Sequence, residues 1–244
     1  FVISASAPDA LTFAQLVQQL VDSQRTEGLL AINPYIDNRF NALPADVPTV
    51  LIGAVARDQK YGSVALDEEL AGRQATQCLL GLGHQHIAHI TGPLVEDCSK
   101  ERRLGYFSAL QAAGIFPDPS LVLEGDWSAT SGDAAVRRWL AAGVSFTALF
   151  AQNDRMAVGA IRALREAGLR VPDDISVMGF DDMPLASYFD PPLTTVRQDI
   201  FNIGCEAARQ LIWSIENPAE PPRNLRIQAE LVIRNSTIPC EEVP

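Results

Sequence analysis

Long apolar runs and a basic start followed by an apolar stretch, the patterns that predict a membrane-spanning helix and a signal peptide, are missing from the sequence. None of its apolar runs approaches the roughly 20 residues that a helix needs to cross a bilayer. It opens on Phe1-Val2-Ile3, a run typical of a strand and unlike the basic start of a signal peptide. The sequence therefore predicts a protein without a transmembrane helix or a signal peptide.

Cysteine and histidine are scarce. The four cysteines are far apart and form no Cys-x-x-Cys pair: Cys78, Cys98, Cys205 and Cys240. This pattern favours free thiols in a reducing compartment over a disulfide framework, and predicts a cytoplasmic protein. Of the three histidines, His86 and His89 should point to opposite faces of one strand, which disfavours a metal site. Turn or core positions are the better interpretation for all of them.

Positive charge is in deficit. The chain has 19 lysines and arginines against 30 aspartates and glutamates, for a net charge of −11. A free-standing nucleic-acid-binding domain usually carries a basic face, because phosphate neutralisation supplies most of its affinity. The acidic balance therefore argues against direct DNA contact by this segment.

The motifs of common catalytic sites are also absent. There is no Gly-x-Ser-x-Gly turn, no cysteine beside a strand-end histidine and no glycine-rich phosphate loop. Asp181 and Asp182 are adjacent carboxylates, but neighbours in sequence need not aim at one bond. The sequence therefore predicts neither an enzyme nor a bound cofactor.

A regular alternation of strand and helix patterns fills the chain. The expected strands cover residues 1–5, 28–32, 49–52, 63–66, 87–90, 121–123, 148–151, 175–180, 194–196, 225–227 and 231–234. The expected helices cover 12–25, 67–82, 99–113, 133–142, 156–167 and 199–215. Continuous apolar strands between helices indicate parallel sheets covered on both faces. The prediction is an α/β fold with two similar, doubly wound halves.

Polar residues follow the expected strands. They form four strings, Gly125-Asp126-Trp127-Ser128, Gln152-Asn153-Asp154, Asp181-Asp182 and Arg197-Gln198-Asp199, with Arg102 and Arg103 in the first turns of a helix. Ligands of open parallel sheets bind beyond the carboxyl ends of the strands. Carboxylates, amides, a guanidinium and an indole face suit a polyhydroxylated ligand such as a sugar.

Each of these residues also has an ordinary structural interpretation. Asn153 and Asp154 could each cap the following helix, and for Asp154 this is the better explanation. One of Asp181 and Asp182 could simply hold a turn. Arg103 fits a solvated surface position, and Trp127 fits a core position. Their concentration at successive strand ends favours a binding site over these separate explanations.

Several strings, in order and with matching spacing, resemble the LacI/GalR family of bacterial transcription regulators. The matching strings are Gly83-His84-Gln85-His86-Ile87-Ala88, Arg102-Arg103-x-Gly105-Tyr106-x-x-Ala109-Leu110, Gly125-Asp126-Trp127-Ser128, Asn153-Asp154-x-Met156-Ala157-x-Gly159-Ala160, Ile175-Ser176-Val177-x-Gly179-Phe180-Asp181-Asp182, Pro192-Leu193-Thr194-Thr195-Val196-x-Gln198-Asp199 and Leu231-Val232-x-Arg234-x-Ser236-Thr237. The resemblance covers nearly the whole chain.

The resemblance implies a periplasmic-binding-protein-like architecture of two Rossmann-like subdomains joined by three crossovers. It places the crossovers near Val95, near Gln198 and near 217–222. The expected N-terminal subdomain is then 1–95 with 198–218, and the expected C-terminal subdomain is 96–197 with 219–244.

The resemblance also implies a function. The chain would be the effector-sensing core of a repressor, with a sugar or glycoside bound in the cleft between the subdomains and an allosteric effect on operator DNA. The implied ligand-binding residues are Arg102, Trp127, Asn153, Asp181 and Gln198. The family also includes purine and nucleoside binders, so that alternative stays open. A homodimer is implied, and a tetramer is left open.

The start of the chain departs from the family. Nothing matches the helix-turn-helix headpiece and hinge helix that bind operator DNA. The family's first strand and helix also have no counterpart, since Phe1–Ala5 resembles its second strand. The alternative is a periplasmic sugar-binding protein for transport, which shares the fold. The strings "GFDD" and "PLTTVRQD" favour the regulator.

Overall fold

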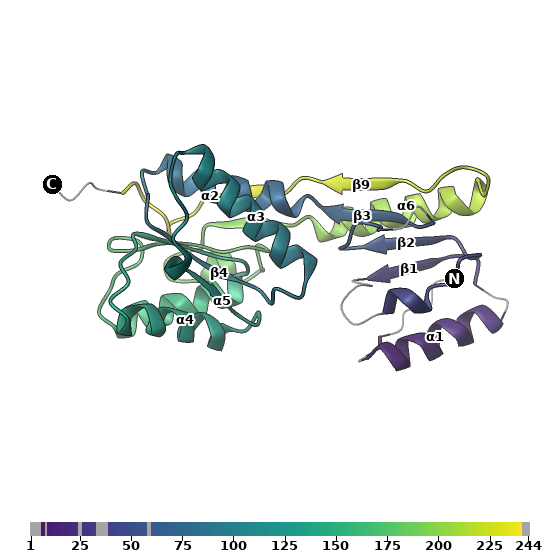
Figure 1. Ribbon diagram of the computed structural model, residues 1–244, viewed down its shortest axis with the longest axis horizontal. Helices are drawn as coiled ribbons and strands as arrows, with labels where there is room; N and C mark the ends of the chain where they lie inside the picture. The colour runs from purple at the N-terminus through teal and green to yellow at the C-terminus, as the bar shows by residue number, and fades with distance from the viewer. Residues whose placement is uncertain (1–5, 8, 24–25, 33–38, 58–59, 241–244) are drawn as a thin grey trace. The chain divides into compact units, whose positions relative to one another are not determined.

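The chain folds into two compact units of alternating helices and strands (Figure 1). The computed structural model describes residues 6–7, 9–23, 26–32, 39–57 and 60–240, so the strand expected at 1–5 lies outside the described residues. One unit is formed by Phe1–Leu66 with Asp199–Ile227, and the other by Asp67–Gln198 with Gln228–Pro244. In the described part of the chain, no helix is both long and apolar enough to span a membrane.

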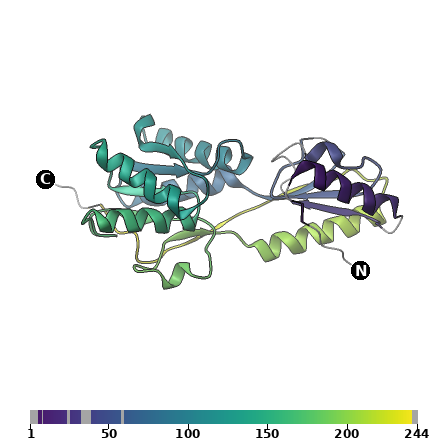
Figure 2. The same cartoon turned by 90° about the horizontal axis from the view of Figure 1, so that it is seen from below.

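The first unit is a parallel sheet with helices on both faces. Its elements are α1 (Ala10–Asp22), β1 (Leu29–Ile32), a 3-10 helix (Arg39–Ala42), β2 (Thr49–Ile52), β3 (Gly62–Leu66), α6 (Ile200–Glu216) and β9 (Asn224–Ile227). The strands run in the order β1-β2-β3-β9. On β2, Val50 packs with Ile203 of α6, and the next residue, Leu51, belongs to the cluster that Phe13 of α1 joins. Figure 2 shows α1 and α6 on opposite sides of these strands.

The second unit repeats this design. It contains α2 (Glu68–Gly81), β4 (Ile87–Thr91), α3 (Asp97–Ala112), a 3-10 helix (Pro119–Leu121), β5 (Val122–Glu124), α4 (Ala129–Ala141), β6 (Ala148–Ala151), α5 (Asp154–Glu166), β7 (Ser176–Met178), a 3-10 helix (Ala186–Tyr188), β8 (Thr195–Arg197) and β10 (Glu230–Val232). A parallel sheet has the order β5-β4-β6-β7, and β8 pairs with β10 antiparallel. The predicted α/β class with doubly wound parallel sheets is confirmed.

Side chains that alternate along the strands of the second unit reach the helices on both faces of its sheet. Ile90 of β4 packs in the core with Trp139 of α4. The neighbouring His89 points the other way and stacks on Tyr106 of α3, with ring centroids 4.5 Å apart. This period of two explains why the strands read as continuous apolar runs.

The helices α2 and α3 touch through their backbones at two glycines. A side chain on Gly72 would strike the backbone of Arg102, and one on Gly105 would strike the carbonyl oxygen of Glu69. Removing the Cβ atom at both places lets the two helices approach closely. This approach brings the start of α2 beside the first turns of α3.

The division into units corrects two of the expected crossover positions. The first crossing was expected near Val95, but it lies between Leu66 and Asp67, because β4 pairs with β5 and β6 rather than with β3. The strand β4, which ends at Thr91, therefore lies inside the second unit. The second crossing, expected near Gln198, lies between Gln198 and Asp199. The third lies between Ile227 and Gln228, beyond the expected 217–222.

The last two strands do not pair with each other. β9 joins the parallel sheet of the first unit beside β3, and β10 lies antiparallel to β8 in the second unit. Their similar apolar pattern carries no information about which strand each one joins.

The close contact between α2 and α3 yields a stability prediction. Gly105→Ala should lower the free energy of unfolding by about 1–3 kcal/mol, because the new methyl group meets the backbone of α2. Gly81→Ala is the matched control on the same helix pair, since no atom lies within 4 Å of a Cβ added there. It should leave stability unchanged or raise it by up to about 1 kcal/mol. Urea unfolding measures both variants, and equal effects would contradict the packing described.

Candidate functional site

The five residues expected to bind ligand all lie in the second unit, at the carboxyl ends of its strands. Trp127 follows β5, Asn153 follows β6, Asp181 follows β7 and Gln198 follows β8, while Arg102 lies on α3. Because β4 to β7 are parallel, their carboxyl ends share one edge of the sheet. The structure therefore brings together residues that are up to 96 positions apart in the chain.

Arg102 is the most buried charged residue of this group, at 4% exposed. Its Nε and Nη2 donate to the two carboxylate oxygens of Glu68, at 2.6 and 3.1 Å. Its Nη1 donates to the carbonyl oxygen of Gln152 at 2.8 Å. The guanidinium carbon lies 3.6 Å from the ring centroid of Phe180 and 5.8 Å from that of Trp127. These contacts hold the guanidinium in one orientation.

The side chain of Gln152 is fully buried and joins three segments beneath the site. Its Oε1 accepts from the backbone N–H of Gly92 at 2.9 Å, which fixes the direction of the amide. Its Nε2 therefore donates to the carbonyl oxygen of Ser99 at 3.1 Å and to Nε2 of His89 at 3.0 Å.

His89 is neutral in this network. Its Nε2 accepts from Gln152, so its Nδ1 carries the proton and donates to the carbonyl oxygen of Phe150 at 2.9 Å. Burial lowers the pKa of His89 to about 3, against the opposing effect of the bond to Phe150. The uncharged ring can therefore stay in the core between aromatic neighbours.

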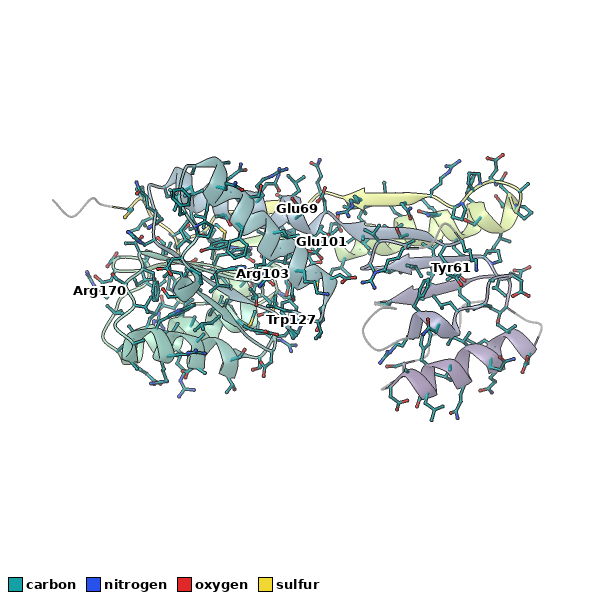
Figure 3. The ribbon with its side chains drawn as sticks, in the orientation of Figure 1. Tyr61, Glu69, Glu101, Arg103, Trp127 and Arg170 are labelled. Carbon is teal, nitrogen blue, oxygen red and sulfur yellow. The ribbon has the colours of Figure 1, made fainter. Side chains whose placement is uncertain are left out.

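Trp127 presents an indole at the end of β5 (Figure 3). Its backbone has a φ of 68°, which is uncommon for a residue other than glycine. Its Nε1 donates to Glu96 at 2.9 Å. The six-membered ring lies so close to Gly92 that a Cβ atom there would collide with it. The half-buried indole is thus fixed by the hydrogen bond from Nε1 to Glu96 and by the contact of its six-membered ring with Gly92.

Asn153 has the capping role that was expected for Asp154. Its Oδ1 accepts from the backbone N–H of Met156 at 2.8 Å at the start of α5, and its Nδ2 donates to the carbonyl oxygen of Trp127 at 3.0 Å. Asp154 instead turns toward the loop after β7. The expectation for Asp154 was wrong because Asn153, one residue earlier, holds the extended backbone that a helix cap requires.

Asp181 and Gln198 form a second pair at the strand ends. The Nε2 of Gln198 donates to a carboxylate oxygen of Asp181 at 2.6 Å. Asp181 has a φ of 106°, and its backbone N–H donates to the carbonyl oxygen of Val196 at 2.8 Å. Burial raises the pKa of Asp181, although Arg102 and the bond from Gln198 act in the opposite direction.

Asp154 and Asp182 stabilise the loop that presents Asp181. Asp154 accepts from the hydroxyl of Thr195 at 2.6 Å and from the backbone N–H of Met183 at 2.7 Å. Burial raises the pKa of Asp154 to about 6. Asp182 accepts from Arg197 and from Arg234, both at 2.7 Å, and these bonds lower its pKa despite its partial burial. The two carboxylates near Asp181 thus have pKa values shifted in opposite directions, upward for Asp154 and downward for Asp182.

Residues that support the site were harder to find from the sequence than residues at strand ends. Glu68 and Glu96 were not among the expected site residues, yet they hold Arg102 and Trp127. Both lie at the start of a helix, where acidic residues are common for other reasons. Gln152 directly precedes the expected Asn153 in the sequence. Nothing in its position indicated that its buried side chain would bond three other segments.

The arrangement has the groups needed to recognise a polar ligand. It offers a carboxylate, two amides and a guanidinium beside an aromatic face, which is the set that hydroxyl groups and a sugar ring require. Within residues 6–240, apart from the short gaps, no cluster of three or more histidine, cysteine, aspartate or glutamate side chains could hold a metal ion.

Comparisons with known proteins agree with this geometry. The model of a periplasmic binding protein-like domain matches residues 76–237. The HTH-type transcriptional regulator CelR of Thermobifida fusca is 37% identical over 217 residues, which are 87% of this chain and 64% of CelR. The ribose operon repressor of Haemophilus influenzae is 33% identical over 238 residues, which are 96% of this chain and 71% of the repressor. The chain therefore spans about two thirds of the length of these relatives.

A solved structure supports the same assignment. The CelR–cellobiose complex superposes with a TM-score of 0.87 and 36% identity, over 96% of this chain and 72% of the other. Fold and strand-end site thus define a periplasmic-binding-protein-like ligand-binding core. The chain belongs to the LacI family of transcriptional regulators.

The neutral His89 yields a prediction for pH dependence. Its pKa is 6.5 when unperturbed and about 3 in the fold, so below pH 6.5 the unfolded chain binds a proton that the folded chain does not. Stability should therefore fall as the pH drops from 6.5 toward 3. The loss should be steeper in the wild type than in His89→Gln, by up to about 1.4 kcal/mol per pH unit. Urea unfolding between pH 7.5 and 4.5 measures this, and equal slopes would contradict a buried neutral imidazole.

Proposed function

We propose that this chain is the sensing core of a transcriptional repressor and binds a sugar or glycoside effector at the strand ends of its second unit. The observation that carries the proposal is the union of Arg102, Asp181 and Gln198 with the Trp127 indole at one edge of the sheet. Carboxylate and amide groups bond pairs of hydroxyls, and the indole packs on the C–H face of a sugar ring.

The bonds that these residues make within the chain support this role. Asp181 and Gln198 satisfy each other at 2.6 Å, so both are already oriented, and a hydroxyl that inserts between them can donate to the carboxylate and accept from the amide. Asn153 holds the Trp127 carbonyl, which couples the cap of α5 to the position of the indole. A relative whose solved complex contains cellobiose has the same fold at 36% identity.

Regulation would operate by a shift between states of the intact protein. An effector can change operator affinity only to the extent that it binds one state more tightly than the other. Operator binding is proposed for the full-length protein, by analogy with the HTH-type regulators that extend beyond the region matched here. A homodimer is proposed from the resemblance to the family.

Two other assignments make different predictions. A purine effector would require flat stacking and ring-nitrogen contacts, and hypoxanthine in the screen below tests that alternative. A transport protein would carry an export signal in the gene upstream of Phe1, whereas a regulator would carry a helix-turn-helix sequence there. The regulator names of both relatives favour the latter.

A ligand screen tests the proposal. Cellobiose, D-glucose, D-ribose and hypoxanthine are added separately while the melting temperature is measured, and at least one sugar should raise it by mass action. Asp181→Asn should weaken binding of that sugar by about 10-fold or more, because a charged hydrogen bond is lost. The control is Asp173→Asn, an exposed carboxylate paired with Arg170, which lies far from Trp127 on this unit (Figure 3).

Three results would contradict the proposal. They are a screen in which no sugar binds, one in which hypoxanthine alone binds, and equal affinities for wild type and Asp181→Asn. Loss of binding in Asp173→Asn as well would indicate a general loss of folding, which circular dichroism would detect.

A further inference from the structure

Glu68 is the one acidic side chain that bonds Arg102 within the described residues, and it does so through both oxygens. The two side chains are only 12% and 5% exposed, respectively. A carboxylate that is buried against a binding-site guanidinium has two consequences. It neutralises the positive charge, and it occupies the edge of the fork that phosphates and carboxylates normally bind.

The contacts of Arg102 leave two of its N–H groups for a ligand. A guanidinium has five N–H groups, and three of them donate to Glu68 and Gln152. Two N–H groups are left, one on Nη1 and one on Nη2, and these can donate to hydroxyl oxygens. Phe180 covers one planar face of the guanidinium, 3.6 Å away, so a ligand cannot stack on that face.

The charges around the site are balanced. The pKa of the Asp181 carboxyl group is lowered by the charges of Arg102 and Arg155, the latter on the first turn of α5, and raised by the charge of Glu68. The charge of Asp181 in turn raises the pKa of Asp154. When Asp182 is counted with its partners Arg197 and Arg234, the positive and negative groups at the strand ends balance. Neutralisation of Arg102 by Glu68 therefore leaves no excess of positive charge to attract an anion.

We propose that Glu68 sets the charge selectivity of the site: it reserves Arg102 for uncharged sugars and rejects phosphorylated sugars and other anions. This inference rests on the proposed sugar-binding function and adds the chemical class of the ligand. Glu68 is a specificity-determining residue, since removing its charge would expose a buried guanidinium fork that is shaped for a phosphate.

Titration with inorganic phosphate tests the inference without knowledge of the natural effector. Isothermal titration calorimetry on the intact protein should detect little phosphate binding to the wild type. Glu68→Gln should bind phosphate at least about 10-fold more tightly, because a repulsive charge and a competitor are both removed. Glu69→Gln is the matched control: it removes the same charge from the next residue of α2, which is exposed (Figure 3), and it should behave as the wild type does.

Two further variants localise the effect. Adding Arg102→Gln to Glu68→Gln should abolish the gained phosphate binding, which would show that the gain occurs at this guanidinium. Glu68→Asp, which keeps the negative charge, should not gain phosphate binding. The inference is overturned if the wild type binds phosphate as tightly as Glu68→Gln does, or if Glu69→Gln gains binding equally.

A folding defect and a failed proposal for the function remain distinguishable. If Glu68→Gln unfolds, the inference is tested with Glu68→Asp and with the wild type. The wild type should bind D-glucose, D-ribose or cellobiose more tightly than D-glucose 6-phosphate and D-ribose 5-phosphate. Equal or tighter binding of a phosphorylated sugar would overturn the inference and leave the sugar-binding function standing. Binding of no sugar by the wild type, with a gain of phosphate binding in Glu68→Gln, would refute the proposed function and support the charge filter.

Discussion

The buried guanidinium of Arg102 ties together the elements that form the site. It bonds Glu68 on α2 and the backbone after β6, and it stacks on Phe180 after β7. The pair can form only because Gly72 lets the backbones of α2 and α3 approach within contact distance. Burying two charges is costly, and such pairs are poor sources of stability. Their retention here is better explained by the need for a fixed, neutralised guanidinium at the strand ends.

The strand-end loops also contain energetically costly features that specific contacts stabilise. Trp127 and Asp181 have positive φ values of 68° and 106°, conformations that cost free energy in residues other than glycine. The hydrogen bonds from Asn153 to the Trp127 carbonyl, and from the Asp181 backbone to Val196, hold these conformations in place. Strained backbone at two of the proposed ligand-binding residues is consistent with a site organised before a ligand arrives.

Local sequence patterns predicted the elements well but not their partners. The strand and helix at Ile87–Thr91 and Asp97–Ala112 lie where the pattern placed them, because apolar period and capping residues act within a few positions. Which sheet β4 joins depends on pairing across the chain, so the first crossover was expected some 30 residues too late. The strand-end rule located Trp127 and Asp181, whereas Glu68 was missed because its partner is 34 residues away.

The central claim is that an uncharged sugar binds at the strand ends of the second unit, against a neutralised Arg102. A crystal structure of the intact protein with the sugar identified by ligand screening tests it most directly. The account predicts sugar oxygens within hydrogen-bonding distance of Asp181 and of the free end of Arg102, the ring against Trp127, and the Glu68 carboxylate still paired with the guanidinium. A sugar bound elsewhere, or one that displaces Glu68 from Arg102, would contradict it.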